Sequence, residues 1–397
     1  MISFEKAIEI VEKFDMRMDT EKVSLNNANN RVLAENIKSD IDMPLFDKSA
    51  MDGIALRYKD LNNSKNFKVV ENIAAGEFKD KKLNKNECVK IMTGAPVPES
   101  CDTVIRREYI INYKDKDITV EKEEKEGSNI AYKGEDFKKG EVLLEKGHQI
   151  NEFSIGTIAT AGKMFVKVYQ NPKIKYYATG DEVYEPDEEL PKSGIRNSNA
   201  YSVMSFFDRR NIHAGYGGII KDTREDLKER IDKATRENDI IILSGGVSAG
   251  EYDYIPDIVE ELGFDIIWHK IAMKPGKPQL FARKGNKLIF GLPGNPVSTT
   301  LALYVFVLPI IRKITGFKNV WENFFFGELE GKTKRKKRRY HFLPAKVTDL
   351  GGDYKLETVI TNGSGDICGA SKGDAYMIIP PETEDFDKGR VKFFFVR

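Results

Sequence analysis

The spacing of apolar residues changes twice along this chain. Residues 1–20 place apolar side chains such as Phe4 and Val11 at helical spacing, which predicts an amphipathic helix. From residue 21 to about residue 151 the apolar residues come in short runs, such as 88–92, separated by Gly, Asn, Asp and Pro. This second pattern predicts one or two β-rich modules.

From about residue 173 short buried runs alternate with helical segments. Because strands that alternate with helices at this spacing pair side by side, the pattern predicts a mostly parallel, doubly wound sheet. After Gly316 the β pattern returns and predicts a small C-terminal β domain. The expected strands are 173–178, 213–220, 239–243, 265–268 and 288–292, and the expected helices are 199–210, 223–236, 254–262 and 297–314.

The composition is that of an ordinary globular protein. Of 397 residues 40% are hydrophobic, and this length predicts roughly two to four domains. A net charge of +1 argues against wholesale nucleic-acid binding. No apolar run approaches the roughly 20 residues of a membrane span, and no signal-peptide pattern is present. The three dispersed cysteines fit a reducing cytoplasm and offer no disulfide or zinc framework.

Three polar, glycine-containing segments follow predicted strands, at 179–182, 244–253 and 291–298. Because the carboxyl ends of strands in an open α/β sheet face one crevice, these segments are expected to converge. Gly245 and Gly246 would let backbone N–H groups approach a phosphate closely. One such loop alone is as often a plain turn, but three in series predict a phosphate-binding crevice.

Side chains in these segments suit the same ligand. Ser248 and Ser298 add hydroxyl donors. Glu182 and Asp253 add carboxylates that could hold Mg²⁺ against the phosphates.

Three lysines, Lys270, Lys274 and Lys277, surround a Pro-Gly-Lys-Pro turn at 275–278. A single lysine is usually a solvated surface charge. Here the prolines restrict the backbone and limit the entropy lost when an anion binds. Lysine is a compact point charge that suits tetrahedral oxyanions, so the cluster predicts an anionic substrate.

Other signals have plainer interpretations. The basic run 332–341 is either a nucleic-acid or targeting patch or a charged edge strand protected against aggregation, and the second is favoured. The Asp-Gly and Thr-Gly pairs at 52–53 and 93–94 are, taken alone, turn chemistry. No histidine has the spacing of a metal ligand.

Seven ordered motifs resemble those of the MoeA-type molybdopterin molybdenumtransferases, the family that includes the gephyrin E domain. They span residues 49–298, and 363–365 extends the resemblance over nearly the whole chain. The motifs are Ser-Ala-Met-Asp-Gly (49–53), Ile-Met-Thr-Gly-Ala-Pro (91–96), Gly-Glu-Asp (134–136), Thr-Gly-Asp-Glu (179–182), Ser-Gly-Gly-Val-Ser (244–248), Lys-Pro-Gly-Lys-Pro (274–278) and Gly-Leu-Pro-Gly-Asn-Pro-Val-Ser (291–298).

The resemblance implies an elongated homodimer of four-domain subunits with an α/β-plus-β fold. The implied parts are a doubly wound, molybdopterin-binding α/β domain (1–21 and 168–322), a β-rich connecting domain (22–40 and 141–167), a β-rich lobe that contributes to the partner's active site (41–140), and a C-terminal β-barrel domain (323–397).

The resemblance also implies a reaction of molybdenum cofactor biosynthesis. In it, molybdate is inserted into adenylyl-molybdopterin and AMP is released, with Mg²⁺ as the cofactor. Tungstate stays open as the oxyanion, because both are tetrahedral dianions of similar size. A cytoplasmic enzyme is expected, with a molybdopterin adenylyltransferase as a candidate partner. The alternative is a non-catalytic molybdopterin-binding carrier or scaffold.

Matching motifs transfer the family's site residues to this chain. The resemblance implies catalytic roles for Asp52, Thr93, Glu182, Asp222, Asp253, Lys270 and Lys274. It implies substrate contacts from Gly245, Gly246, Ser248, Lys277, Pro293, Gly294, Asn295, Ser298 and Ser364, and Mg²⁺ ligation by Glu182 and Asp253.

Individual roles follow from the same resemblance. Asp52 and Thr93 would reach the crevice of the partner subunit, and Asp222 would contact the pterin. Lys270 and Lys274 would neutralise charge on the pyrophosphate during its cleavage. Ser364 would help close the oxyanion pocket from the C-terminal domain.

The chain departs from the family at one position. Many members have an arginine where Pro344 stands here. If that arginine helps to bind molybdate, another cation must replace it, and Arg338 and Arg339 are the candidates.

Overall fold

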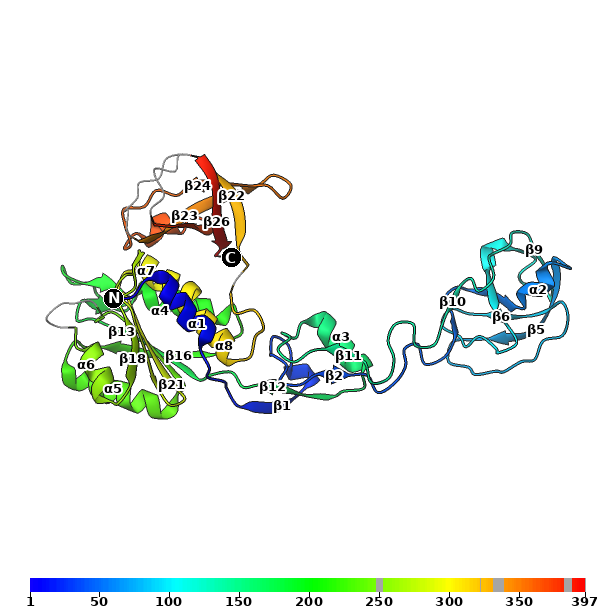
Figure 1. The fold of residues 1–397 in the computed structure, drawn as a ribbon, viewed down its shortest axis with the longest axis horizontal. Coiled ribbons are helices and arrows are strands. Elements are labelled where there is room, and N and C mark those ends of the chain that lie inside the picture. The colour runs from blue at the N-terminus through cyan, green and yellow to red at the C-terminus, as the bar shows by residue number, and fades with distance from the viewer. Residues whose placement is uncertain (248–252, 322, 331–338, 382–387, 397) are drawn as a thin grey trace. The chain divides into compact units, whose positions relative to one another are not determined.

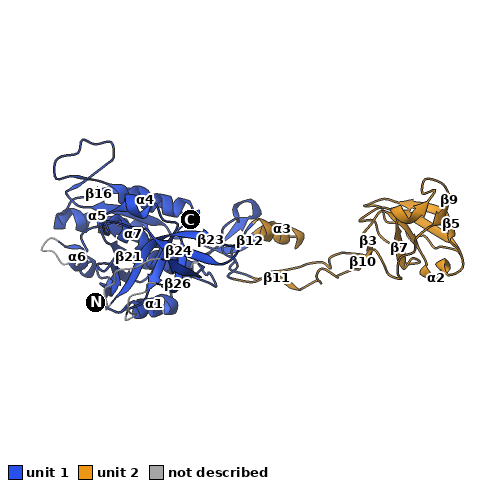
Figure 2. Ribbon diagram, turned by 90° about the horizontal axis from the view of Figure 1, so that it is seen from above, with its two compact units in different colours: residues 1–35, 147–151, 166–397 blue, residues 36–146, 152–165 orange. Residues whose placement is uncertain are grey.

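The structure, a computed structural model, divides the chain into two compact units (Figure 2). Unit 1 comprises residues 1–35, 147–151 and 166–397, and unit 2 comprises the rest. The predicted four-domain division is finer and stays a prediction. The residues described are 1–247, 253–321, 323–330, 339–381 and 388–396.

A six-stranded sheet forms the centre of one half of unit 1, in the order β16-β13-β17-β21-β20-β18. Its first four strands run parallel, and β20 pairs antiparallel with both β21 and β18. This confirms the predicted mostly parallel α/β sheet. The strands are β13 (Ile174–Thr179), β16 (Ala214–Ile220), β17 (Ile240–Ser244), β18 (Asp265–His269), β20 (Leu280–Lys284) and β21 (Lys287–Leu292).

Alternating side chains on the buried strands build one core on each face of this sheet. On β17, Ile240 and Ile242 enter the first core, while Ile241 and Leu243 enter the second. Helices cover both faces (Figure 1). The first core holds residues of α1 (Phe4–Lys13), α4 (Ser198–Asp208), α7 (Pro296–Ala302), η3 (Leu303–Val307) and α8 (Leu308–Ile314), and the second those of α5 (Arg224–Glu237) and α6 (Ile255–Glu261).

Polar side chains set the start of two helices where the sequence predicts them. Ser3 accepts a hydrogen bond from Lys6 N at 3.1 Å at the start of α1. Thr223 accepts one from Asp226 N at 3.3 Å at the start of α5. Each bond satisfies a backbone donor that the first helical turn leaves free.

The prediction that no apolar run approaches the length of a membrane span is wrong for Pro296–Ile314, which has the length and apolar composition of one. Its side chains belong to the first core, and 83% of the apolar window is buried inside the protein. Burial among protein side chains accounts for its composition.

A closed five-stranded barrel forms the C-terminal part of unit 1. Its strands pair in the order β23-β24-β22-β26-β25, and β25 returns to β23. The short strand β19 (Met273–Lys274), from the lysine-rich segment, joins β23 so that Lys274 lies opposite His341. The barrel strands are β22 (Phe325–Glu330), β23 (Tyr340–Asp349), β24 (Tyr354–Thr358), β25 (Ala375–Ile379) and β26 (Lys388–Phe395). The predicted C-terminal β-barrel is confirmed.

Unit 2 is built on a curled six-stranded sheet in the order β7-β4-β6-β5-β9-β8. Ile54 and Leu56 of β4 face one apolar cluster and Ala55 faces another. The strands are β4 (Gly53–Leu56), β5 (Asn66–Ile73), β6 (Glu87–Ile91), β7 (Thr103–Arg106), β8 (Ile110–Ile111) and β9 (Asp117–Val120).

Short elements connect these parts. In unit 2 they are β2 (Ile37–Lys38), β3 (Lys48–Ser49), α2 (Tyr58–Leu61), η2 (Arg107–Tyr109), β10 (Ile130–Ala131), β11 (Val142–Leu144) and α3 (Glu152–Thr160). Elsewhere they are β1 (Thr20–Ser24), η1 (Leu25–Asn27), β12 (Phe165–Tyr169), β14 (Val183–Tyr184), β15 (Ile195–Arg196) and α9 (Ile367–Ala370).

The buried strand β17 generates a stability prediction. Ile242 is 0% exposed, so Ile242→Ala leaves a cavity in the first core and should lower the free energy of unfolding by roughly 2–5 kcal/mol. Urea unfolding followed by tryptophan fluorescence measures this loss. The matched control Ile360→Ala removes a side chain that is 90% exposed and should change stability by less than about 0.5 kcal/mol. Equal effects of the two changes would contradict the core assignment.

Candidate functional site

Three neighbouring parallel strands end at one edge of the α/β sheet, at Thr179, Ser244 and Leu292. Thr179 Oγ1 donates to Ser244 O at 3.3 Å, and Gly245 N donates to Leu292 O at 3.1 Å. The structure therefore brings together the three segments that the sequence places after strands.

The loop after β17 requires glycine at two successive positions. Gly245 and Gly246 have φ values of +105° and +62°. A Cβ on Gly245 would lie 2.6 Å from the Thr179 carbonyl oxygen, and one on Gly246 would lie 2.9 Å from Ile255 Cδ1. A side chain at Gly245 would therefore collide with backbone, and one at Gly246 would displace the end of Ile255 from a left-handed backbone that disfavours side chains.

Asn199, in the first turn of α4, joins this loop to the one after β21. Its Nδ2 donates to Gly294 O at 2.7 Å and lies 3.5 Å from Ser244 Oγ, which is itself 2.5 Å from Tyr176 OH. Asn199 was not among the residues predicted from the sequence. Its only signal was a polar residue at the start of a helix.

An acidic corner lies after β13 and β16. Asp222 N donates to Asp181 Oδ1 at 3.3 Å. Burial, with the negative charges of Glu182, Asp181 and Asp253, raises the pKa of Asp222 to about 6. These carboxylates therefore repel one another in the absence of a cation.

The acidic corner suits Mg²⁺ by its donor chemistry. Carboxylate oxygens are the hard ligands that Mg²⁺ takes, and the ion typically uses one or two of them together with substrate phosphates. Over the described part of the chain, no three Asp, Glu, His or Cys side chains already form a metal cage. The buried Asp222 Oδ1 has no hydrogen-bond partner among the described residues, which leaves it available as a ligand.

A cavity of about 360 Å³ lies between the lysine-rich turn, the start of α7 and the barrel. Lys274, Lys277, Arg339 and His341 line it, together with the hydroxyl groups of Ser298, Thr361 and Ser364. No Asp or Glu is among the described lining residues. Three positive charges with no carboxylate among the described lining residues favour an anion.

Hydrogen bonds close this cavity from the barrel side. Asn295 Nδ2 donates to Ser364 Oγ at 2.8 Å, and Val297 N donates to Ser364 O at 3.2 Å. Pro293 also lines the cavity, whereas Gly294 lies at the neighbouring loop contact with Asn199.

Pro344 stands where many members of the family have an arginine. Pro344 pairs with Tyr376 in the barrel and lines the cavity. Arg339 supplies a guanidinium group from five residues earlier, and Arg338 lies outside the described residues. His341, which is 8% exposed, was missed because a histidine without a neighbouring ligand gave no signal.

Other predicted residues lie elsewhere. Lys270 follows β18 with a φ of +72° and does not line the cavity. Ser248 and most of the basic run 332–341 lie outside the described residues. In unit 2, Thr93 donates to Asp52 Oδ1 from its backbone N at 2.8 Å and its hydroxyl at 2.9 Å, and these bonds lower the pKa of Asp52.

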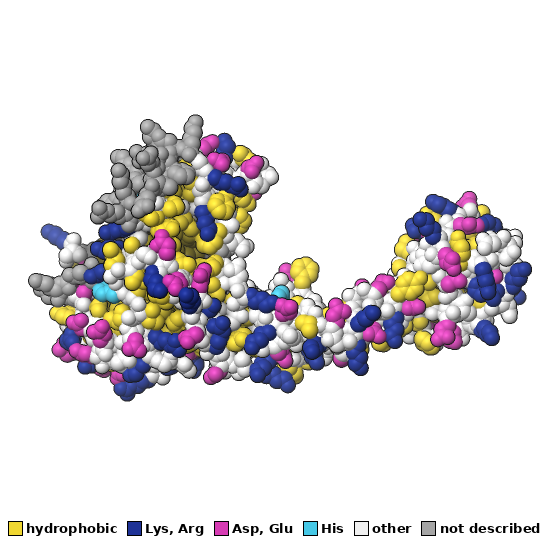
Figure 3. Space-filling view, in the orientation of Figure 1, with side chains coloured by type: hydrophobic (Ala, Val, Ile, Leu, Met, Phe, Trp, Pro, Cys, Tyr) yellow, Lys and Arg dark blue, Asp and Glu magenta, His cyan; other side chains and the backbone are white. Residues whose placement is uncertain are grey.

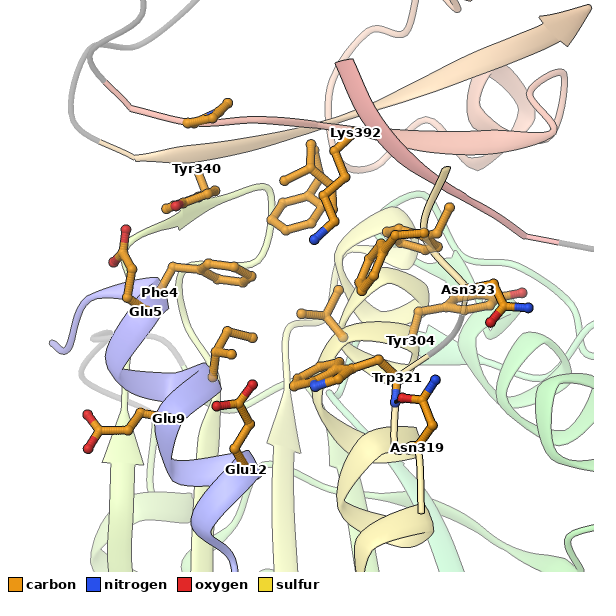
Figure 4. Close-up of a pocket in the computed structure, with 17 residues that line it drawn as sticks. Phe4, Glu5, Glu9, Glu12, Tyr304, Asn319, Trp321, Asn323, Tyr340 and Lys392 are labelled. Carbon is orange, nitrogen blue, oxygen red and sulfur yellow. Dashed lines mark hydrogen bonds between the residues drawn. The ribbon is translucent and has the colours of Figure 1, made fainter. Parts of the chain in front are cut away.

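A larger groove of about 780 Å³ runs between α1 and the barrel (Figure 4). Figure 3 shows apolar side chains gathered between the α/β half and the barrel. Phe4, Trp321 and Phe394 line the groove, with Glu5 and Lys392 among its charged residues. None of the predicted site residues lines it, although Phe342 lines both this groove and the anion cavity.

The fold and cavity together define a multidomain protein with an anion site between an α/β domain and a β-barrel. Three family descriptions match the chain: "MoeA N-terminal region (domain I and II)" at residues 2–162, "Probable molybdopterin binding domain" at 175–313 and "MoeA C-terminal region (domain IV)" at 327–391.

Whole-length relatives agree. Molybdopterin molybdenumtransferases of Staphylococcus epidermidis and Staphylococcus aureus are each 31% identical to the chain over 98% of its length and 94% of theirs. A crystal structure of the molybdopterin biosynthesis MoeA protein of Pyrococcus horikoshii is 30% identical, with a TM-score of 0.82 and coverage of 100% of this chain and 99% of that one.

The chain belongs to the MoeA family. The family predicted from the motifs is confirmed, and so is the enzyme class, since the relatives are named molybdopterin molybdenumtransferases.

The acidic corner generates a pH prediction. The folded-state pKa of Asp222 exceeds its ordinary value of 3.8, so ionisation of Asp222 destabilises the fold as the pH rises through about 6. Asp222→Asn should therefore raise the free energy of unfolding at about pH 7.5 by about 1 kcal/mol, after allowance for solvent screening.

Thermal unfolding without divalent cations, at about pH 7.5 and pH 4.5, measures this effect. The stabilisation should shrink toward zero at the lower pH. Equal stability changes at both values would show that the charge of Asp222 is not the cause.

Proposed function

We propose that the protein inserts molybdate or tungstate into adenylyl-molybdopterin and releases AMP, as a cytoplasmic enzyme of molybdenum cofactor biosynthesis. The observation that carries this proposal is the cavity lined by Lys274, Lys277 and Arg339, with no carboxylate among its described lining residues. It lies beside the loops at the carboxyl edge of the sheet, since Pro293 and Asn295 line it too. A tetrahedral dianion in the cavity would thus adjoin a phosphorylated ligand on those loops.

The chain's residues would act by positioning and charge. Lys274 and Lys277 would hold the oxyanion, and Ser298 and Ser364 would donate hydrogen bonds to its oxygens. Gly245 and Gly246 would admit the phosphates close to the backbone. Lys270 would offset charge that develops on the pyrophosphate as it is cleaved.

Mg²⁺ fits the acidic corner. Glu182 and Asp253 would hold the ion, with Asp222 near enough to feel its charge. When bound, the ion would neutralise phosphate charge and favour departure of AMP. A bound cation would offset the repulsion among Glu182, Asp253 and Asp222 that raises the pKa of Asp222. The three carboxylates would therefore stay ionised.

The proposal includes a homodimer whose sites are shared. Asp52 and Thr93 would complete the site of the partner subunit. The hydrogen bonds from Thr93 fix the Asp52 carboxylate and favour its ionised form. An ionised carboxylate is the form that would contact a cation or a hydrogen-bond donor. A molybdopterin adenylyltransferase is the partner that would deliver the substrate.

Measurements of AMP release test the roles proposed for Lys274 and Asp253. Lys274→Ala and Asp253→Ala should each reduce oxyanion-dependent AMP release by roughly 10²–10³-fold, because the first removes a charge that holds the oxyanion and the second a ligand of the Mg²⁺ that offsets phosphate charge. The assay supplies purified protein, adenylyl-molybdopterin, Mg²⁺ and either oxyanion, and quantifies AMP.

Matched controls are Lys233→Ala on α5 and Asp257→Ala on α6, both exposed, which should leave AMP release unchanged. Unchanged turnover in both site variants would refute the assigned site. Tight pterin binding by the wild-type protein without any AMP release would instead favour the carrier or scaffold.

Subunit mixing tests the shared site. Asp52→Ala and Lys274→Ala proteins, each inactive alone, are co-expressed with different tags. Random association should restore about a quarter of the wild-type activity, because half of the dimers are mixed and each has one intact site. Activity that stays at the level of the single variants would show that Asp52 serves its own subunit or no site at all.

A further inference from the structure

The lysine-rich turn is closed at its base by backbone hydrogen bonds. Lys270 N donates to Gln279 O at 2.9 Å, and Ile271 N donates to Lys277 O at 3.0 Å. The turn between them carries Lys274 and Lys277 into the anion cavity. Its shape therefore depends on the residues at this base.

Gln279 lies beneath the turn and is 2% exposed. Its Nε2 donates to Gly276 O at 2.6 Å and lies 3.1 Å from Met273 Sδ. A carbonyl oxygen only accepts hydrogen bonds, so the side-chain NH₂ group must be the one that faces Gly276. Buried and short, this bond ties the centre of the turn to its base.

Gln279 does not itself line the cavity, whereas Lys274, Gly276 and Lys277 do. Any effect on an anion must therefore pass through the turn. A lysine side chain is flexible and does little by itself to select an anion by its geometry. A fixed backbone must therefore supply that selectivity. Fixing the backbone before the anion arrives also reduces the entropy lost on binding.

We propose that Gln279 is a positioning residue that preorganises Lys274 and Lys277 for a tetrahedral oxyanion. The inference rests on the proposed function for the identity of the anion. It predicts that the affinity for the oxyanion, and not for the pterin substrate, depends on the hydrogen bond from Gln279 to Gly276.

Gln279→Glu tests this with nearly unchanged side-chain volume. Burial raises the pKa of the introduced carboxyl group. Above that pKa the carboxylate cannot donate to Gly276 O, so the KM for molybdate should rise about tenfold while kcat and the KM for adenylyl-molybdopterin change less than about twofold. As the pH falls, the protonated carboxyl can donate again. The ratio of variant to wild-type KM for molybdate should then return toward one.

Gln279→Met separates the hydrogen bond from packing. It keeps an unbranched side chain of similar length but has no donor, so its KM for molybdate should be raised at every pH. Gln149→Glu, an exposed change elsewhere in unit 1, should leave both KM values unchanged. Thermal unfolding of each variant shows whether the fold is kept.

Two outcomes would overturn the inference. In the first, the Gln279 variants lower kcat and raise both KM values together. In the second, they match the wild-type KM for molybdate. Direct tungstate binding, measured by calorimetry on the same proteins, separates a failure of this inference from a failure of the proposed function. If the wild type binds tungstate but releases no AMP, the proposed function fails. Gln279→Met should even then bind tungstate about tenfold more weakly than the wild type. Equal tungstate affinity in the two proteins would overturn the inference.

Discussion

One short backbone pairing determines whether this protein has an anion site. Met273 and Lys274 leave the α/β half of unit 1 and pair with Tyr340 and His341 of the barrel. The same segment is tied back to the α/β half by Lys270 N and Ile271 N. Lys274 is thereby held between two domains. Because the barrel contributes Arg339 and His341 across that pairing, the cations meet only when both halves are folded.

Three hydrogen bonds near that pairing hold the neighbouring segments in place. Asn199 ties the loop after β21 to α4, and Ser364 ties the start of α7 to the barrel. Gln279 ties the lysine-rich turn to its own base. Positive charges gathered without carboxylates would repel one another, and these bonds hold them in place without neutralising them.

Much of the fold was predictable from the sequence because its signals are local. The short, uninterrupted apolar run at 240–243 favoured a strand buried on both faces, and the expected helix 223–236 begins at the cap formed by Thr223. Because parallel strands end at one edge of a sheet, the three glycine-containing segments were expected there. The observed strand order agrees. Motif resemblance added the C-terminal barrel and the family.

The remaining site residues could not be predicted, because their roles arise from contacts between distant segments. Nothing near His341 in the sequence shows that it pairs with Lys274, and nothing near Gln279 shows that it lies under Gly276. The exclusion of carboxylates from the cavity is likewise a property of four separate segments. Asp52 and Thr93 belong to unit 2, and nothing in the sequence around them links them to the segments that line the cavity.

The central claim is that the cavity between the lysine-rich turn and the barrel binds the oxyanion. Crystals soaked in tungstate, with diffraction recorded at the tungsten absorption edge, test it most directly. The account predicts an anomalous peak within hydrogen-bond distance of Lys274, Lys277 and Ser364. An anomalous peak elsewhere, with that cavity ordered and empty, would contradict it.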